Sequence, residues 1–133
     1  MKITILGGSG FLGSHVVDAL VRKGHKVKVF DIKRSIWLPK GIKMYTGDIL
    51  NTKSLDKVIK GADIVFHFAA LADLDRALKD PINSVKINIL GTVLALEMCR
   101  KHNIKRFIYA STIYVNSIEG GFYRSSKKAG EDY

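Results

Sequence analysis

The chain has 133 residues, of which 47% are hydrophobic and 26% are charged, a composition that excludes a disordered chain. Its length gives room for one domain with one core, and we find no apolar run approaching the roughly 18 residues of a membrane span. The net charge is +10, but the 22 Lys and Arg are scattered and form no basic block. This pattern favours a solvated surface that attracts small anions over a nucleic-acid interface.

The single cysteine, Cys99, lies in a helical pattern, so the sequence provides neither a disulfide framework nor a cysteine metal site. The histidines His15, His25 and His102 also lack the spacing of metal ligands. The N-terminus opens directly into a predicted strand and shows no secretion signal. We therefore expect a cytoplasmic protein with no bound metal and no membrane partner.

Strands and helices alternate along the chain. In chain order we expect a strand at Lys2–Leu6, a helix at Phe11–Lys23, strands at Lys26–Phe30 and Ile42–Thr46, a helix at Ser54–Lys60, a strand at Asp63–Phe68, a helix at Pro81–His102, a strand at Arg106–Ala110 and a helix beginning near Tyr123. This alternation predicts an α/β fold, a Rossmann-type doubly wound parallel sheet with strand order 3-2-1-4-5. A ligand crevice is expected where that order reverses.

A glycine-rich loop connects the first predicted strand to the first helix. Gly7, Gly10 and Gly13 follow the apolar run Ile3–Leu6, and Gly8 offers a second spacing of the same kind. Glycines here let the backbone turn sharply and bring its N–H groups close to a phosphate at the helix N-terminus. The strand before and the helix after favour a dinucleotide site over an ordinary turn.

Asp31 follows the second strand, 18 residues after Gly13. A carboxylate at this place can accept both hydroxyls of an adenosine ribose and would repel a 2′-phosphate. The position favours NAD over NADP, although the nearby Lys33 and Arg34 would neutralise such a phosphate.

Tyr123 and Lys127 stand four residues apart on the last predicted helix, and hence on one face. A phenol titrates near 10, so a neighbouring ammonium and a positively charged nicotinamide would have to lower its pKa before it could act as a base at neutral pH. The preceding strand ends in Ser111 and Thr112, whose hydroxyls can hold a reacting oxygen.

Taken together, these motifs resemble the extended short-chain dehydrogenase/reductase family, in its branch of NAD-dependent sugar-nucleotide epimerases and dehydratases. The motifs that carry the resemblance are spread over the whole length: Gly7-x-x-Gly10-x-x-Gly13, Asp31, Gly47-Asp48-Ile49, His67-Phe68-Ala69-Ala70, Asn88-Ile89-Leu90-Gly91-Thr92, Ala110-Ser111-Thr112 and Tyr123-Arg124-Ser125-Ser126-Lys127.

The resemblance implies a catalytic Thr112, a general base in Tyr123, and a Lys127 that binds the nicotinamide ribose and lowers the tyrosine pKa. It implies that NAD is bound by Gly7, Gly10, Phe11, Leu12, Gly13, Asp31, Ile32, Lys33, Asp48, Ile49, Phe68, Ala69, Ala70, Leu71, Asn88, Ala110, Ser111, Tyr123 and Lys127. A nucleotide sugar would be the substrate, epimerised by transient hydride transfer. A homodimer through the helices at 81–102 and 123–133 is implied as well.

The sequence departs from the family pattern in three places, one of which is the loop from Val115 to Tyr123, which is much shorter than in many relatives. Ile113 and Tyr114 stand where the 4,6-dehydratases carry Asp and Glu, which makes dehydratase chemistry unfavourable. Asn116 and Ser117 replace a common Tyr-Gly pair. Two alternatives stay open, another NAD(P)-dependent hydroxyl oxidoreductase and a non-catalytic dinucleotide-binding module.

The C-terminal residues Ala129–Tyr133 contain no helix stop signal, and the predicted strand Arg106–Ala110 would leave a bare apolar edge. We therefore expect residues 1–133 to be the front, NAD-binding portion of a longer chain, inactive on its own.

Overall fold

Five parallel strands form a single sheet in the order β3-β2-β1-β4-β5. The structure is a computed structural model that describes residues 1–133. The strands are β1 (Lys2–Leu6), β2 (Lys26–Asp31), β3 (Lys43–Thr46), β4 (Ile64–His67) and β5 (Arg106–Tyr109). The strand order reverses at β1, which pairs with β2 on one side and with β4 on the other. The predicted topology is confirmed.

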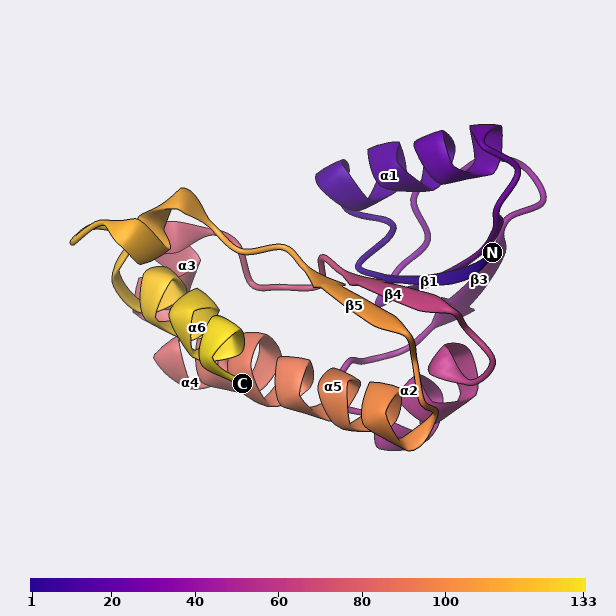
Figure 1. Cartoon of the computed structure of the whole chain (residues 1–133). Coiled ribbons are helices and arrows are strands. Elements are labelled where there is room, and N and C mark those ends of the chain that lie inside the picture. The colour runs from indigo at the N-terminus through magenta and orange to yellow at the C-terminus, as the bar shows by residue number, and fades with distance from the viewer.

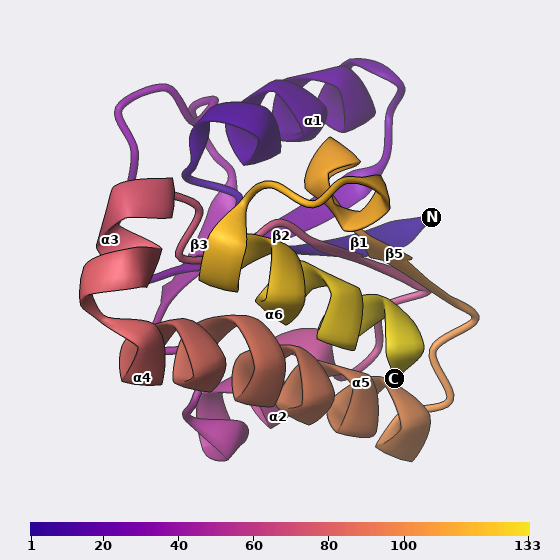
Figure 2. The same cartoon turned by 90° about the vertical axis from the view of Figure 1, so that its left-hand side faces the viewer.

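Helices cover both faces of this sheet, as a doubly wound fold requires. They are α1 (Phe11–Arg22), α2 (Thr52–Ile59), α3 (Leu74–Lys79), α4 (Pro81–Ser84), a π-helical turn η1 (Val85–Leu90), α5 (Gly91–Lys101), a 3₁₀ turn η2 (Ile113–Asn116) and α6 (Gly121–Asp132). Helix α1 lies alone on one face, and α2 and α5 lie on the other (Figure 1). Helix α6 runs beside the α4–α5 segment, with α3 near its N-terminal end (Figure 2).

Successive residues of a strand point to opposite faces, so the sheet carries two apolar cores. On the α1 face, Ile5 and Val29 pack with Val17 of the helix. On the opposite face, Leu6 joins Leu55 of α2 in a larger cluster that also takes residues from α5. Both cores are built from the central strands, and this fixes the strand ends where a ligand would bind.

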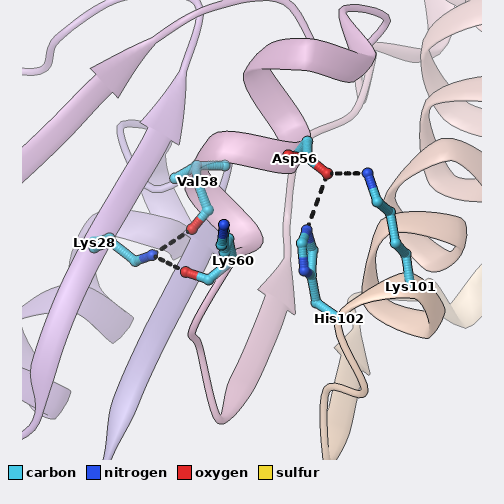
Figure 3. Close-up of polar contacts among 6 residues, drawn as sticks. All are labelled: Lys28, Asp56, Val58, Lys60, Lys101 and His102. Carbon is cyan, nitrogen blue, oxygen red and sulfur yellow. Dashed lines mark hydrogen bonds and ion pairs between the residues drawn. The ribbon is translucent and has the colours of Figure 1, made fainter.

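Helix α2 is tied to its neighbours by the polar contacts drawn in Figure 3. Lys28 of β2 donates from Nζ to the carbonyl oxygens of Val58, at 2.6 Å, and Lys60, at 3.1 Å, at the C-terminal end of α2. Asp56 accepts hydrogen bonds from Lys101 Nζ at 2.6 Å and His102 Nε2 at 3.0 Å. These two hydrogen bonds lower the pKa of the Asp56 carboxyl. Helix α2 is therefore held both to the sheet and to α5.

The helix predicted at Pro81–His102 is present but has an internal π-helical turn over Val85–Leu90. Sequence periodicity did not reveal this turn, nor the short helix α3 that precedes it. Helix α3 begins where Asp73 Oδ1 accepts a hydrogen bond from the Arg76 amide at 2.8 Å. The remaining predicted elements agree with the structure within one or two residues at each end.

The prediction that no apolar stretch approaches the length of a membrane span was wrong for this segment. The helix from Pro81 to Lys101 has 21 residues, and its most apolar window reaches a mean hydropathy of 1.3, which is enough for a membrane span by length and composition. In this fold 33% of that window is buried, and Ala95 and Cys99 pack into the apolar cluster on this face of the sheet. The Cys99 thiol is free and buried.

Candidate functional site

A cleft of about 430 Å³ lies beyond the carboxyl ends of β1, β2 and β4, where the strand order reverses. Eleven of the residues predicted to bind the cofactor line it: Gly7, Gly10, Asp31, Ile32, Lys33, Asp48, Ile49, Phe68, Ala69, Ala70 and Leu71. The crevice predicted from the topology is therefore a real cavity, and the residues chosen for it from the sequence meet there.

Two glycines allow the floor of this cleft to close. Gly7 has φ +81°, and a Cβ at this position would collide with the backbone of Ala69 in the loop after β4. A Cβ at Gly13 would collide with the carbonyl oxygen of Gly7 and lie 2.8 Å from the Cα of Gly8. The first turn of α1 therefore sits directly against the glycine loop, which only residues without a side chain permit.

The first turn of α1 has unpaired N–H groups. Gly10 is its N-cap, and no side chain caps it. The first N–H groups of a helix have no partner within the helix, so those of Phe11, Leu12 and Gly13 are free to bind an anion. The side chains of Phe11 and Leu12 are 81% and 61% exposed, and neither residue lines the cleft. Any cofactor contact from these three residues would therefore come from the backbone.

Asp31 joins the end of β2 to the glycine loop. Its Oδ2 accepts a hydrogen bond from the Ser9 amide at 2.9 Å, and its Oδ1 accepts one from the Ile32 amide at 2.7 Å. The carboxylate is therefore held in a fixed place at the mouth of the cleft, beside Lys33. Carboxylate oxygens retain further lone pairs after such bonds and can accept ribose hydroxyls.

One end of the cleft lies near β3. Phe30, Gly47 and Leu50 line it together with Asp48 and Ile49. A Cβ on Gly47 would lie 2.8 Å from the Phe30 ring, so glycine is needed for the loop to pass over the aromatic side chain. Asp48 Oδ1 accepts a hydrogen bond from the Leu50 amide at 2.8 Å, which fixes the turn.

The far wall of the cleft comes from α3, α4 and η1, through Arg76, Asn83 and Ile87. Sequence reasoning missed all three, together with Ser9. The Arg76 guanidinium forms no ion pair with any carboxylate, so its positive charge in the cleft lining is free to meet an anion. The available signals were the helix starts at Asp73 and at Asp80–Pro81, which place these side chains beside the loop after β4.

Asn88, predicted to support the site, lies behind the cleft lining and is 1% exposed. Its Oδ1 accepts from the Leu71 amide at 2.7 Å, and its Nδ2 donates to the Leu71 carbonyl at 3.1 Å and to Ser126 Oγ at 2.9 Å. Ser126 Oγ in turn donates to the Tyr123 carbonyl at 2.8 Å. One amide therefore holds both the loop after β4 and the helix that carries Tyr123 and Lys127.

Tyr123 and Lys127 share a face of α6, as their spacing predicts. Lys127 Nζ lies 5.9 Å from the centroid of the Tyr123 ring and donates to the Ala110 carbonyl at 2.8 Å. The Lys127 side chain is buried, at 2% exposure, whereas Tyr123 is half-buried. Both residues lie outside the lining of the cleft, as Asn88 does.

In the chain without cofactor, burial raises the pKa of the Tyr123 phenol. The lowering expected from the ammonium together with an oxidised nicotinamide concerns the cofactor-bound state and stays a prediction. Burial also lowers the pKa of Lys127 to about 8. Within the chain alone, desolvation therefore outweighs the attraction between phenolate and ammonium. Only a further positive charge beside Tyr123 would reverse the shift.

The two hydroxyls after β5 have different partners. Ser111 Oγ donates to Glu131 Oε1 at 2.6 Å and is turned toward the C-terminal part of α6. Thr112 is the N-cap of η2, and its Oγ1 accepts from the Tyr114 amide at 3.4 Å. Turn η2 packs against α6, so Thr112 lies in the connection between the last strand and the helix that carries Tyr123.

His67 ends β4 and is fully buried. Its Nε2 lies 2.9 Å from Thr92 Oγ1, and burial lowers its pKa to about 3. The imidazole is therefore neutral and packed against its neighbours.

Known proteins share both the sequence and the fold. A model of the NAD dependent epimerase/dehydratase family matches residues 3–127. The chain is 36% identical over 117 residues to a putative UDP-glucose 4-epimerase of Methanocaldococcus jannaschii, covering 83% of this chain and 37% of that protein. It is 34% identical over 119 residues to the mouse sterol-4-alpha-carboxylate 3-dehydrogenase, covering 86% of this chain and 30% of the enzyme.

Among solved structures, a UDP-glucose 4-epimerase of Thermus thermophilus in complex with NAD superposes with a TM-score of 0.88 at 29% identity. The alignment covers 100% of this chain and 49% of that one. The chain thus spans from about a third to about half the length of the proteins it matches. Since the family model covers residues 3–127, and the fold agrees, the chain belongs to the NAD-dependent epimerase/dehydratase family.

Proposed function

We propose that this chain is the NAD-binding portion of a nucleotide-sugar epimerase, an isomerase that works by transient hydride transfer. The observation that carries the proposal is the cleft at the point where the strand order reverses. The glycine loop that leads into α1 forms its floor, and the Asp31 carboxylate lies at its mouth. Residues 1–133 would form a single Rossmann domain, with the substrate-binding part supplied by sequence outside it.

The residues of the cleft fit a dinucleotide. Gly7 and Gly10 line the cleft without side chains, so a diphosphate can lie close to the backbone. Asp31 provides a fixed acceptor for the adenosine ribose, and the apolar side chains of Phe30, Ile49 and Leu50 in the lining suit adenine. Asp31 favours NAD, because a 2′-phosphate would be repelled by its charge.

When bound, the nicotinamide would accept and return the hydride. The chain's own residues would handle the proton and the orientation. Tyr123 would take the proton of the sugar hydroxyl, Thr112 would hold the same oxygen, and Lys127 would hold the ribose and keep a positive charge near the phenol. Roles for the other predicted contacts, Ala110 and Ser111 among them, belong to this same proposal.

UDP-glucose is the substrate class we favour, because the archaeal relative and the Thermus structure are both named UDP-glucose 4-epimerases. The mouse relative is a sterol dehydrogenase, so an oxidoreductase acting on another secondary hydroxyl is the second candidate. We further propose a cytoplasmic homodimer formed through the helices at 81–102 and 123–133, with no membrane or nucleic-acid partner.

Two measurements test the proposal. Titration of the 133-residue chain with NAD should show weak, saturable binding that NADP reproduces less well. In the protein extended through the sequence that follows, UDP-glucose should be converted to its 4-epimer. There, Tyr123→Phe should lower turnover by about 100-fold or more and leave NAD binding intact. Turnover of other hydroxyl substrates alone would favour the oxidoreductase, and binding without turnover would favour a non-catalytic module.

A further inference from the structure

The ammonium of Lys127 is buried without an acidic partner. Its side chain is 2% exposed, and no ion pair joins it to a carboxylate. A buried ammonium without compensation tends to lose its proton. Something other than a carboxylate must therefore stabilise the charged form in this place.

Two groups lie against the ammonium, and both come from the end of β5. The Ala110 carbonyl accepts one of its hydrogens at 2.8 Å. The Tyr109 ring presents its face, with Nζ 4.6 Å from the ring centroid. The Tyr123 ring is farther away, with its centroid at 5.9 Å. A cation within about 6 Å of an aromatic centroid is attracted by the negative face of the ring, more strongly where water is excluded.

The Tyr109 ring is fixed in this position from both sides. Its centroid lies 5.6 Å from that of His67, and its hydroxyl end sits against Gly130 of α6. A Cβ on Gly130 would lie 2.7 Å from Tyr109 Cζ, so only glycine leaves room for the ring. Tyr109 Oη is buried and forms no hydrogen bond of good geometry, although the Thr92 side chain lies close enough to lower the pKa of Tyr109 in part.

We propose that Tyr109 is a positioning residue for Lys127, whose ring holds the ammonium charged and in place at the end of β5. This inference rests on the proposed function, in which the charged Lys127 faces the cofactor ribose and the Tyr123 phenol. The ring is a neutral partner at every working pH, since burial raises the pKa of Tyr109 to about 12. The other titratable groups around this pair are the neutral His67 of β4, Tyr123 of the same helix as Lys127, and Glu131, which accepts from Ser111 Oγ and contributes to raising the pKa of Tyr109.

The test is the titration of Lys127 in the chain without cofactor. Lysine carrying ¹³C at Cε gives one resonance per residue, and Lys127→Gln identifies the resonance of Lys127 by its loss. We expect Tyr109→Phe, which keeps the ring, to titrate at the wild-type midpoint. We expect Tyr109→Leu, which fills a similar space without the ring, to lower the midpoint by about 0.5–1.5 pH units.

A second variant covers the case in which Tyr109→Leu does not fold, as judged by its circular dichroism. Gly130→Ala keeps every group of the pair but pushes the ring away from the ammonium, and it too should lower the midpoint. If folded Tyr109→Leu or Gly130→Ala titrated at the wild-type midpoint, the inference would be overturned. It would also be overturned if Tyr109→Phe shifted the midpoint as much as Tyr109→Leu does. These titrations are made without NAD, so failure of the proposed function would appear separately. In that case NAD would not bind, while the variants would still show the expected shifts in the Lys127 midpoint.

Discussion

The Ser9 amide and the Asp31 carboxylate are joined by a hydrogen bond of 2.9 Å across the mouth of the cleft. The two residues are 22 positions apart in the sequence, so this bond connects the glycine loop to the end of the neighbouring strand. Asp31 therefore holds the glycine loop in place and is also the candidate acceptor for the ribose hydroxyls.

Replacing Asp31 with Ala should therefore weaken NAD binding by about 10- to 100-fold, because charge-assisted hydrogen bonds each contribute about 1.5–3 kcal/mol. Isothermal titration of the chain with NAD measures the change. Asp75→Ala is the matched control, since Asp75 is exposed on α3 and does not line the cleft. Equal NAD affinity in the Asp31 and Asp75 variants would refute the assignment of the ribose site.

A second prediction concerns Arg76, whose guanidinium forms no ion pair with a carboxylate. It lines the cleft opposite the glycine loop and forms no ion pair, so it should attract the diphosphate. Arg76→Ala should weaken NAD binding by about 3- to 10-fold, more at low salt than at high salt. Lys79→Ala removes a cation from the same helix but outside the cleft and should have little effect. The two variants are compared by NAD titration at two salt concentrations, and equal losses would show that only overall charge matters.

Lys127 should make folding stability depend on alkaline pH. Its folded-state pKa of about 8 lies below the ordinary 10.5, so the unfolded chain binds the proton more tightly. The wild-type chain should therefore gain stability from this residue as the pH rises from about 8 to about 10.5. At pH 7, where the penalty is complete, Lys127→Met should be more stable by up to about 3 kcal/mol, and this difference should shrink by pH 10.

Urea unfolding at pH 7 and pH 10 measures the effect. Lys128→Met is the control, because Lys128 is exposed and pairs only with Glu131 and Asp132 at the surface. It should change stability by no more than about 1 kcal/mol. A difference between Lys127→Met and wild type that is the same at both pH values would contradict the buried-cation account.

His67 should make the fold sensitive to acid. Its folded-state pKa is lowered to about 3 from 6.5 by burial, so the unfolded chain takes up a proton that the folded chain refuses. Stability should fall as the pH drops from about 6.5 toward 3, by about 2–3 kcal/mol between pH 6.5 and 4.5. His67→Gln should flatten that part of the pH profile, since glutamine does not titrate and can still pair with Thr92.

Thermal or urea unfolding across this pH range provides the measurement. His15→Gln, at an exposed position on α1, should keep the wild-type slope. If the His67 variant lost stability with acid as steeply as the wild type, the acid sensitivity would have to come from other groups.

Much of the fold followed from residue patterns because the patterns are local. Alternating apolar residues defined the strands, and Gly24, with φ +75°, ended α1 where it was expected. The glycine loop and Asp31 were placed correctly for the same reason, because a strand, a tight turn and a helix over a short stretch leave few arrangements.

The parts that were missed depend on three-dimensional context. Helix α3 has six residues, too few for helical periodicity to be distinguished from a loop, and with it Arg76 was overlooked. The π-helical turn around Asn88 leaves no periodic signature over so short a span. The rise in the Tyr123 pKa in the chain without cofactor could not be read from spacing, because it comes from desolvation, which depends on packing.

The Asn88 side chain connects two parts of the molecule that are far apart in the sequence. Its amide fixes the distance between the backbone of Leu71 and the hydroxyl of Ser126. A single buried amide therefore sets the distance between the loop after β4 and helix α6, and Asn88→Ala would release both at once.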